Sequence, residues 1–288
     1  MNGPTPTAQA PAAQAPTDQT PTDQAPTDQA PTDQTPTDQA PTHQAGETGA
    51  CLVIGAGDAT GGALARAFAA QGLTACGVRR PRHRGDLERL AAGIRSNGHK
   101  ARAFGVDARD ETAMADLVAE IERDVGPIQV AVFNIGANVN FPVGETTTRV
   151  YTKVWEMAAY AGFLMGREVS GPMAARGTGT IIFTGATASV RGGPGYSAFA
   201  GAKHALRALA QSMARELGPQ GIHVAHVVID GAIDSAFIRE NHPDADERRA
   251  RDGLLIPERI AETYVWLHRQ HRSAWTHELD LRPWCETW

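Results

Sequence analysis

The stretch Cys51-Leu52-Val53-Ile54-Gly55-Ala56-Gly57-Asp58-Ala59-Thr60-Gly61-Gly62 decides the fold of this chain. Its first four residues are apolar and predict a buried strand, and the amphipathic segment Ala63–Gln71 that follows predicts a helix. The small residues between them let the backbone turn tightly and approach a pyrophosphate at the helix N-terminus, where free N–H groups favour anions. The stretch therefore predicts a dinucleotide site that includes Gly55, Gly57, Asp58, Thr60 and Gly61.

Short apolar runs alternate with longer amphipathic segments along the rest of the chain. The expected strands are Cys51–Ile54, Thr74–Val78, Ala101–Gly105, Val130–Phe133, Thr180–Thr184, His223–Ile229 and Glu278–Leu281. The expected helices include Ala63–Gln71, Glu111–Asp124 and Ala202–Leu217. Such alternation is typical of a parallel sheet that is covered by helices on both faces and joined by right-handed connections. We predict an α/β fold, a Rossmann-type doubly wound sheet of about seven strands, as a single domain over residues 49–288.

Residues 1–48 differ in composition from the rest of the chain. Pro-Thr-Asp-Gln repeats run from Pro16-Thr17-Asp18-Gln19 to Pro36-Thr37-Asp38-Gln39. The segment contains no aromatic residue and no Val, Ile or Leu, so it cannot bury enough apolar surface to offset the entropy of ordering. We expect a disordered tail, which either only keeps the protein in solution or serves in docking or spacing.

Charge and cysteine content narrow the class of protein. The net charge is −5, and the first 48 residues hold six acidic residues and no Lys or Arg, so the remainder is close to neutral. This balance argues against nucleic acid as a partner. The three cysteines have neither a disulfide pattern nor metal-ligand spacing, so we expect no metal and a cytoplasmic location. No long apolar run or signal-peptide pattern is visible, so we expect no membrane span.

The glycine-rich turn resembles that of the short-chain dehydrogenase/reductase family, whose pattern is Thr-Gly-x-x-x-Gly-x-Gly. Gly55 and Gly61 match the first and last glycines, whereas Ile54 replaces the Thr and Ala59 replaces the middle Gly. Further landmarks of the family follow in order along residues 50 to 282. The resemblance implies cofactor contacts by Asp107 after the third strand, Asn134 and Gly136 after the fourth, and Gly231, Ile233 and Ser235 after the sixth.

The end of the second expected strand indicates which cofactor is bound. NAD-dependent proteins place an Asp or Glu about 20 residues after the glycines to hold the ribose hydroxyls. This chain has Arg79 and Arg80 there, and a guanidinium suits a 2′-phosphate. We therefore expect NADP(H) rather than NAD(H); the alternative is that these arginines belong to a solvated basic loop.

The resemblance also implies a catalytic Asn, Ser, Tyr and Lys, of which only the Lys is present. Lys203 opens a clear helical pattern and sets the register. Phe199 then occupies the Tyr position, Ala186 the Ser position and Ala158 the Asn position. Hydride reduction of a ketone produces an alkoxide that must be protonated, and positioned acid–base catalysis contributes about 10²–10⁴-fold. We therefore do not expect the family's ordinary ketone chemistry.

Tyr196 lies seven residues before Lys203, which places both on one helix face if the helix begins early enough. This spacing resembles the enoyl reductase branch of the family, in which a Tyr hydrogen-bonds an enolate oxygen. Tyr196 and Lys203 are thus the candidate catalytic residues, and the resemblance implies that Lys203 also holds the ribose of the cofactor. The expected function is NADP(H)-dependent reduction of a polarised C=C bond. The alternatives are that Tyr196 only forms part of the cavity wall, and that the protein binds nucleotide without catalysis, in a regulatory or assembly role.

The C-terminal part predicts specificity and assembly. The resemblance implies that the polar segment from Ala236 to about Leu255 forms a mobile substrate lid. Trp275, Trp284 and Trp288 cluster near the C-terminus, and large aromatic side chains are enriched at subunit interfaces. We therefore expect a homodimer or homotetramer.

Overall fold

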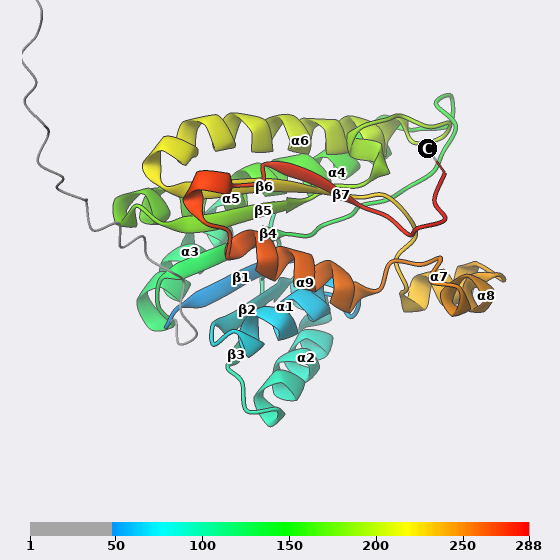
Figure 1. Cartoon of the computed structure of the whole chain (residues 1–288). Helices are drawn as coiled ribbons and strands as arrows, with labels where there is room; N and C mark the ends of the chain where they lie inside the picture. Colours follow the sequence, from blue (N-terminus) through cyan, green and yellow to red (C-terminus); the bar gives the residue numbers. More distant parts are fainter. Residues whose placement is uncertain (1–47, 288) are drawn as a thin grey trace, which may run out of the picture. The chain divides into compact units, whose positions relative to one another are not determined.

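Seven parallel strands form one sheet in the order β3-β2-β1-β4-β5-β6-β7 (Figure 1). The computed structural model describes residues 48–287, so the predicted repeat tail and Trp288 lie outside the described residues. The strands are β1 (Ala50–Ile54), β2 (Thr74–Arg79), β3 (Ala101–Gly105), β4 (Ile128–Phe133), β5 (Gly179–Thr184), β6 (Ile222–Ile229) and β7 (Glu278–Leu281). All seven predicted strands are confirmed, and the largest change in bounds is that β4 begins at Ile128 rather than Val130. The prediction of a Rossmann-type doubly wound fold is therefore confirmed.

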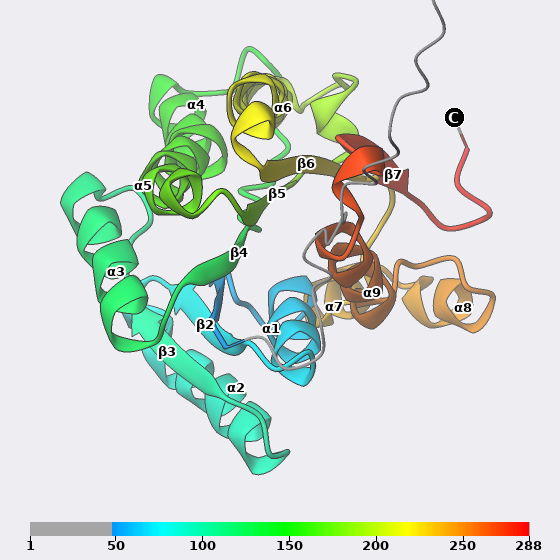
Figure 2. The ribbon, with the colours of Figure 1, turned by 60° about the vertical axis from the view of Figure 1, so that its left-hand side comes forward.

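Helices cover both faces of this sheet (Figure 2). The helices are α1 (Thr60–Ala70), α2 (Arg84–Ser96), α3 (Glu111–Asp124), α4 (Thr148–Trp155), α5 (Ala161–Arg176), α6 (Ser197–Leu217), α7 (Ala236–Asn241), α8 (Ala245–Ala250) and α9 (Pro257–His268). A π-helical turn, Glu156–Tyr160, joins α4 to α5, and short 3₁₀ turns lie at Pro81–His83, Thr187–Ser189, Gly218–Gln220 and Arg272–Ala274. Helices α3, α5 and α6 pack on one face, and α1 and α9 pack on the other. The predicted lid segment contains α7 and α8, beyond the carboxyl ends of the strands.

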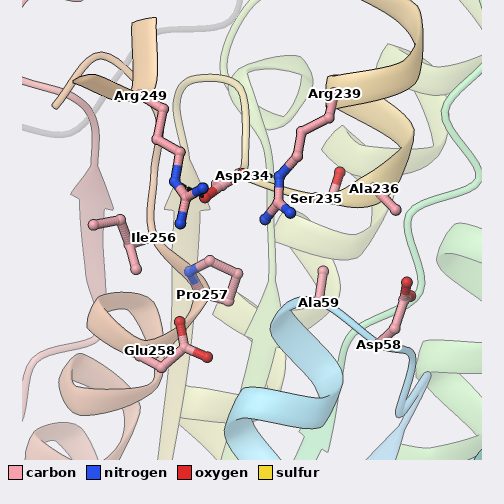
Figure 3. A pocket seen from close by; sticks show the side chains of 10 residues that line it. All are labelled: Asp58, Ala59, Asp234, Ser235, Ala236, Arg239, Arg249, Ile256, Pro257 and Glu258. Carbon is pink, nitrogen blue, oxygen red and sulfur yellow. Dashed lines mark hydrogen bonds and ion pairs between the residues drawn. The ribbon is translucent and has the colours of Figure 1, made fainter. Parts of the chain in front are cut away.

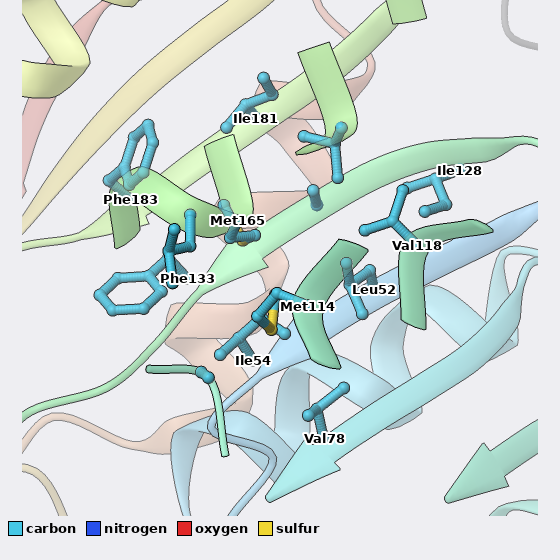
Figure 4. Packing of buried hydrophobic residues seen from close by; sticks show 14 of the residues in the cluster. Leu52, Ile54, Val78, Met114, Val118, Ile128, Phe133, Met165, Ile181 and Phe183 are labelled. Carbon is cyan, nitrogen blue, oxygen red and sulfur yellow. The ribbon is translucent and has the colours of Figure 1, made fainter. Parts of the chain in front are cut away.

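The core consists of two apolar layers that are separated by the sheet. On one side, Leu52, Ile54, Met114, Phe133 and Phe183 belong to a cluster in which strand residues meet α3, α5 and α6 (Figure 4). Every residue of β1 is buried, because helices cover this strand from both sides. Such burial explains why the sequence shows continuous apolar runs rather than alternating ones.

Two helices begin earlier than their apolar patterns predict. Helix α1 begins at Thr60, three residues before the predicted start, because the small residues of the glycine turn are already helical. Helix α6 begins at Ser197 rather than Ala202, two residues after Gly195, which has a φ of +82°. Both starts lie at the carboxyl edge of the sheet, where parallel α/β folds hold their ligands.

The tryptophans and cysteines of the described residues differ in their exposure and contacts. Trp275 stacks on His223 within the same chain, with 5.0 Å between the ring centroids, whereas Trp284 is 78% exposed. Cys51 and Cys76 are buried as expected, and burial raises the pKa of the Cys76 thiol to about 12. Among residues 48–287, no helix is long and apolar enough to cross a membrane.

Candidate functional site

A cavity of about 650 Å³ opens at the carboxyl ends of the central strands. It brings together residues from the turns after β1, β4, β5 and β6 and from the first turns of α6. Eleven predicted site residues line it: Gly55, Gly57, Thr60, Gly61, Asn134, Gly136, Tyr196, Lys203, Gly231, Ile233 and Ser235. Asp58, Arg79, Arg80 and Asp107 do not line it.

The turn after β1, from Gly55 to Gly61, exposes backbone rather than large side chains, and we call it the glycine cradle. Gly55 has a φ of +92°, a conformation that favours glycine, and a Cβ on Gly61 would overlap the Gly55 carbonyl oxygen. Gly57 has no heavy atom within 4 Å of its would-be Cβ, so its backbone is open to the cavity. Ala59 precedes α1 without a side-chain cap, and the first turn of α1 holds no acidic residue. These features fit a pyrophosphate at the helix N-terminus.

Asn134 fixes this cradle from the neighbouring strand. Its Nδ2 donates a hydrogen bond to the Gly55 carbonyl over 3.2 Å, and its backbone N–H donates to the Ile54 carbonyl over 2.8 Å. The side chain therefore ties the end of β4 to the end of β1. Its position supports the predicted site, with a positioning role toward the glycine turn.

Lys203 is a buried amine at the floor of the cavity. Its Nζ donates to the Thr184 carbonyl over 2.8 Å and to the Ile135 carbonyl over 2.9 Å. Burial lowers the pKa of Lys203 from its usual 10.5 to about 7. A protonated amine has three N–H donors, so one remains for a ligand after the two carbonyls are satisfied.

The positions that the family resemblance assigns to Tyr, Ser and Asn carry no exchangeable proton. Phe199 is buried, and its ring centroid lies 5.9 Å from the Lys203 amine. Ala186 lines the cavity, and Ala158 is buried in the π-helical turn. The nearby Ser189 hydroxyl is buried and accepts a hydrogen bond from the Ala186 N–H over 3.1 Å. Ser189 therefore holds the loop in place.

Tyr196 stands immediately before α6 rather than within it. Tyr196 precedes the helix that carries Phe199 and Lys203, and all three residues line the cavity. Tyr196 thus brings a phenol to the same space as the Lys203 amine and the glycine turn.

Arg79, Arg80 and Asp107 form a separate group at the ends of β2 and β3. Partial burial and then the neighbouring Arg82 lower the pKa of Arg80. Arg79 has an acidic neighbour that the sequence pattern did not reveal, Asp86, at 3.7 Å.

The Asp107 carboxylate is held by Arg109. The backbone N–H of Arg109 and its Nε donate to Asp107 Oδ1 over 3.2 and 2.9 Å, and its Nη2 donates to Oδ2 over 2.5 Å. Arg109 is held in turn by Glu156 of the π-helical turn, over 3.1 Å. The hydrogen bonds from Arg109 are the main cause that lowers the pKa of Asp107.

Asp58 lines a second cavity, of about 420 Å³, between the glycine turn and the lid (Figure 3). At its centre Asp234 is buried and pairs with Arg239 at 2.8 Å and Arg249 at 3.1 Å. Figure 3 shows the two arginines reaching this carboxylate from opposite sides. The sequence pattern did not reveal Asp234, because its partners lie five and fifteen residues away.

Arg191 and Thr187 also line the large cavity, and the sequence pattern did not reveal Arg191. Both contact Asp230, a buried residue at the end of β6. Asp230 stands where the family pattern has Pro, and this departure was the one signal available in the sequence.

Comparisons with known proteins identify the family. The family model described as short chain dehydrogenase matches residues 50–246. A short-chain dehydrogenase structure from Rhodopseudomonas palustris is 44% identical, with a TM-score of 0.71, and covers 83% of this chain and 100% of its own. Gluconate 5-dehydrogenase of Gluconobacter oxydans is 30% identical over 60% of this chain and 67% of its own length. Inactive 2-(S)-hydroxypropyl-CoM dehydrogenase 2 of Xanthobacter autotrophicus is 31% identical over 62% of this chain and 81% of its own. The glycine cradle, the sheet order and these matches together show that the chain belongs to the short-chain dehydrogenase/reductase family of NAD(P)-dependent oxidoreductases.

Proposed function

We propose that this protein is an NADP(H)-dependent reductase of a C=C bond conjugated to a carbonyl group. The observation that carries the proposal is that Tyr196 and Lys203 line one cavity with the glycine turn, while Phe199 and Ala186 bring no proton there. An enolate is less basic than an alkoxide, so reduction of a conjugated C=C bond demands less of a proton donor than reduction of a ketone does. One phenol suits this smaller demand.

Each group has a defined task in this proposal. The backbone of the glycine turn holds the pyrophosphate, and the third N–H of protonated Lys203 holds the ribose next to the nicotinamide. The bound cofactor supplies a hydride. The Tyr196 hydroxyl would donate a hydrogen bond to the substrate carbonyl oxygen, where negative charge develops as hydride reaches the β carbon. The resulting enolate would then take a proton from solvent water at its α carbon. Phe199 and Ala188 give the cavity an apolar wall, which strengthens that hydrogen bond.

The preference for NADP(H) over NAD(H) rests on Arg79 and Arg80. The lowered pKa of Arg80, caused by partial burial and then Arg82, indicates a cluster of positive charge that an additional phosphate would relieve. Calorimetric titration of both cofactors tests this preference. Replacing Arg79 and Arg80 with Ala should weaken binding of NADPH while binding of NADH stays as it was. Equal binding of the two cofactors by the parent protein contradicts the preference.

Turnover assays test the reaction class. We expect NADPH consumption with a simple enone such as but-3-en-2-one, and none with a 1,2-dicarbonyl. Tyr196→Phe should reduce enone turnover by about 10²-fold or more, because one positioned donor to a developing oxyanion contributes about that much. Binding of NADPH should be unchanged in this variant. Ketone reduction by the parent, unaffected by Tyr196→Phe, contradicts the assignment of the donor.

A cofactor-binding protein without turnover is the second candidate. The burial of Phe199 and Ala158 at positions assigned to Tyr and Asn favours it, since neither side chain exchanges a proton. The Xanthobacter relative is itself named as inactive. Binding of NADPH without consumption of enone or ketone supports this candidate over the reductase.

We also propose a homodimer or homotetramer. The exposed Trp284 side chain supports an interface, because an isolated aromatic ring of that size is seldom left in water. Light scattering coupled to size exclusion measures the mass directly, and a monomer of 30.6 kDa contradicts the proposal.

A further inference from the structure

The large cavity holds positive charge without a balancing acid in its wall. Arg191 and Lys203 are the charged residues that line it, and within the described part of the chain no Asp or Glu does. Lys203 is already committed to two backbone carbonyls and, in the proposed function, to the cofactor ribose. The Arg191 side chain is 46% exposed and enters the cavity from the loop that also carries Tyr196. The cavity is therefore suited electrostatically to an anion beside Tyr196.

Asp230 positions Arg191 but leaves the N–H donors of its guanidinium available. The Asp230 side chain is only 6% exposed and does not line the cavity, so it supports the guanidinium from the protein side. Arg191 Nη2 lies 3.5 Å from Asp230 Oδ1, too far for a strong charge-assisted hydrogen bond. The same oxygen accepts a shorter bond, of 2.5 Å, from the Thr187 hydroxyl. The fork-shaped donor set of Arg191 thus remains available to a ligand.

The other charges around Asp230 do not cancel Arg191. Arg282 Nη2 lies 3.5 Å from Asp230 Oδ2, so two guanidinium groups share this one carboxylate. Arg282 also pairs with Asp280 of β7, which lies away from the cavity lining. Asp230 is therefore divided between Thr187 and two arginines, of which only Arg191 reaches the cavity.

The position of Arg191 separates it from the cofactor cradle. The cradle follows β1, whereas Arg191 follows β5, on the same loop as Tyr196, and both residues line the cavity. We infer that Arg191 binds a carboxylate of the substrate, so that the substrate class is an anionic, carboxylate-bearing unsaturated carbonyl compound. This inference rests on the proposed reductase function and names the substrate class of that same site. A planar carboxylate suits a guanidinium because two parallel hydrogen bonds form at once.

Binding of a matched pair of probes to the protein loaded with NADP⁺ tests the inference without turnover. The probes are (E)-4-oxo-4-phenylbut-2-enoate and its methyl ester, which differ in the charge of one group. We expect the acid to bind about ten- to a hundredfold more tightly than the ester by calorimetry, in the range of a hydrogen bond to a charged group. Arg191→Gln should abolish that preference, and Arg191→Lys should restore part of it.

Arg102→Gln is the matched control. Arg102 lies on β3, and its side chain is 42% exposed and pairs with Glu120 at 3.0 Å. It does not line the cavity. Its loss removes the same charge from the protein but should leave the preference for the acid unchanged. A loss of preference in this control as well overturns the inference, because net charge alone would then explain it.

Four further outcomes separate the inference from its alternatives. An acid that binds no better than its ester, including failure of both to bind, overturns it. Weaker binding of NADPH in Arg191→Gln, with the preference for the acid intact, assigns Arg191 to the cofactor and also overturns it. A preference for the acid that depends on Arg191 supports the inference even where no probe is reduced, and in that case only the proposed reaction fails. Reduction of acid and ester alike, unaffected by Arg191→Gln, supports the reaction and removes the carboxylate site.

Discussion

Lys203 makes the stability of this protein rise with pH, in the same direction as paired carboxylates do but over a more alkaline range. Burial lowers the pKa of Lys203 from its usual 10.5 to about 7. Between these values the unfolded chain binds a proton that the folded protein does not, so the free energy of unfolding rises with pH. Each pKa unit corresponds to about 1.4 kcal/mol. From about pH 7.5 to about pH 9.5, Lys203 should therefore raise the free energy of unfolding by about 2 to 3 kcal/mol.

Lys203→Met isolates this contribution, because an unbranched apolar side chain of similar length has no proton to lose. Urea denaturation of the parent and the variant, followed by circular dichroism at both pH values, gives the difference in free energy of unfolding. The parent should gain about 2 to 3 kcal/mol on the variant as the pH rises. The two carbonyls that lose their donor, of Ile135 and Thr184, add a cost that does not vary with pH.

Lys153→Met on α4 is the control, since that amine is exposed. The same comparison should show no matching gain there. A Lys203→Met difference that stays constant over this pH range refutes the reasoning, because the buried amine would then not be forced to release its proton on folding.

Three other changes should have distinct effects. Gly61→Ala should abolish NADPH binding in calorimetry and destabilise the fold, because its Cβ would overlap a carbonyl of the glycine turn; parent-like binding contradicts the cradle. Tyr264→Phe should lower the free energy of unfolding by about 1 kcal/mol, through loss of the 2.9 Å bond between its hydroxyl and Thr184 Oγ1; no change in urea denaturation argues against that bond. Phe199→Tyr combined with Ala186→Ser should give NADPH-dependent reduction of a 1,2-dicarbonyl, because Lys203 lies close enough to lower the pKa of the new phenol; an inactive double variant indicates that the register assigned to Phe199 is wrong.

The sheet could be read from the sequence because its signals are local. Each buried strand is a continuous apolar run, and the glycine turn marks where β1 gives way to α1. Eleven of the site residues that the sequence predicted line one cavity.

The pairing of side chains at the strand ends could not be read in this way. The Arg109–Glu156 pair joins residues 47 positions apart, and the π-helical turn that carries Glu156 has no signature in its sequence. Asp86 beside Arg79 was hidden because a short 3₁₀ turn brings it back toward β2. The place of Tyr196 stayed open because three glycines and a proline precede it, and such a loop permits many paths.

The Asp234 carboxylate joins two segments that the chain keeps apart. Arg239 of α7 and Arg249 of α8 share it, so both helices are tied to the same buried carboxylate. Loss of one arginine leaves the other as a tether, whereas loss of Asp234 frees both helices and leaves two cations without a counter-charge. Residues 236–250 could therefore be replaced as one unit. A foreign loop grafted in its place would need two guanidinium groups, five and fifteen residues after the aspartate, to be held over the same cavity.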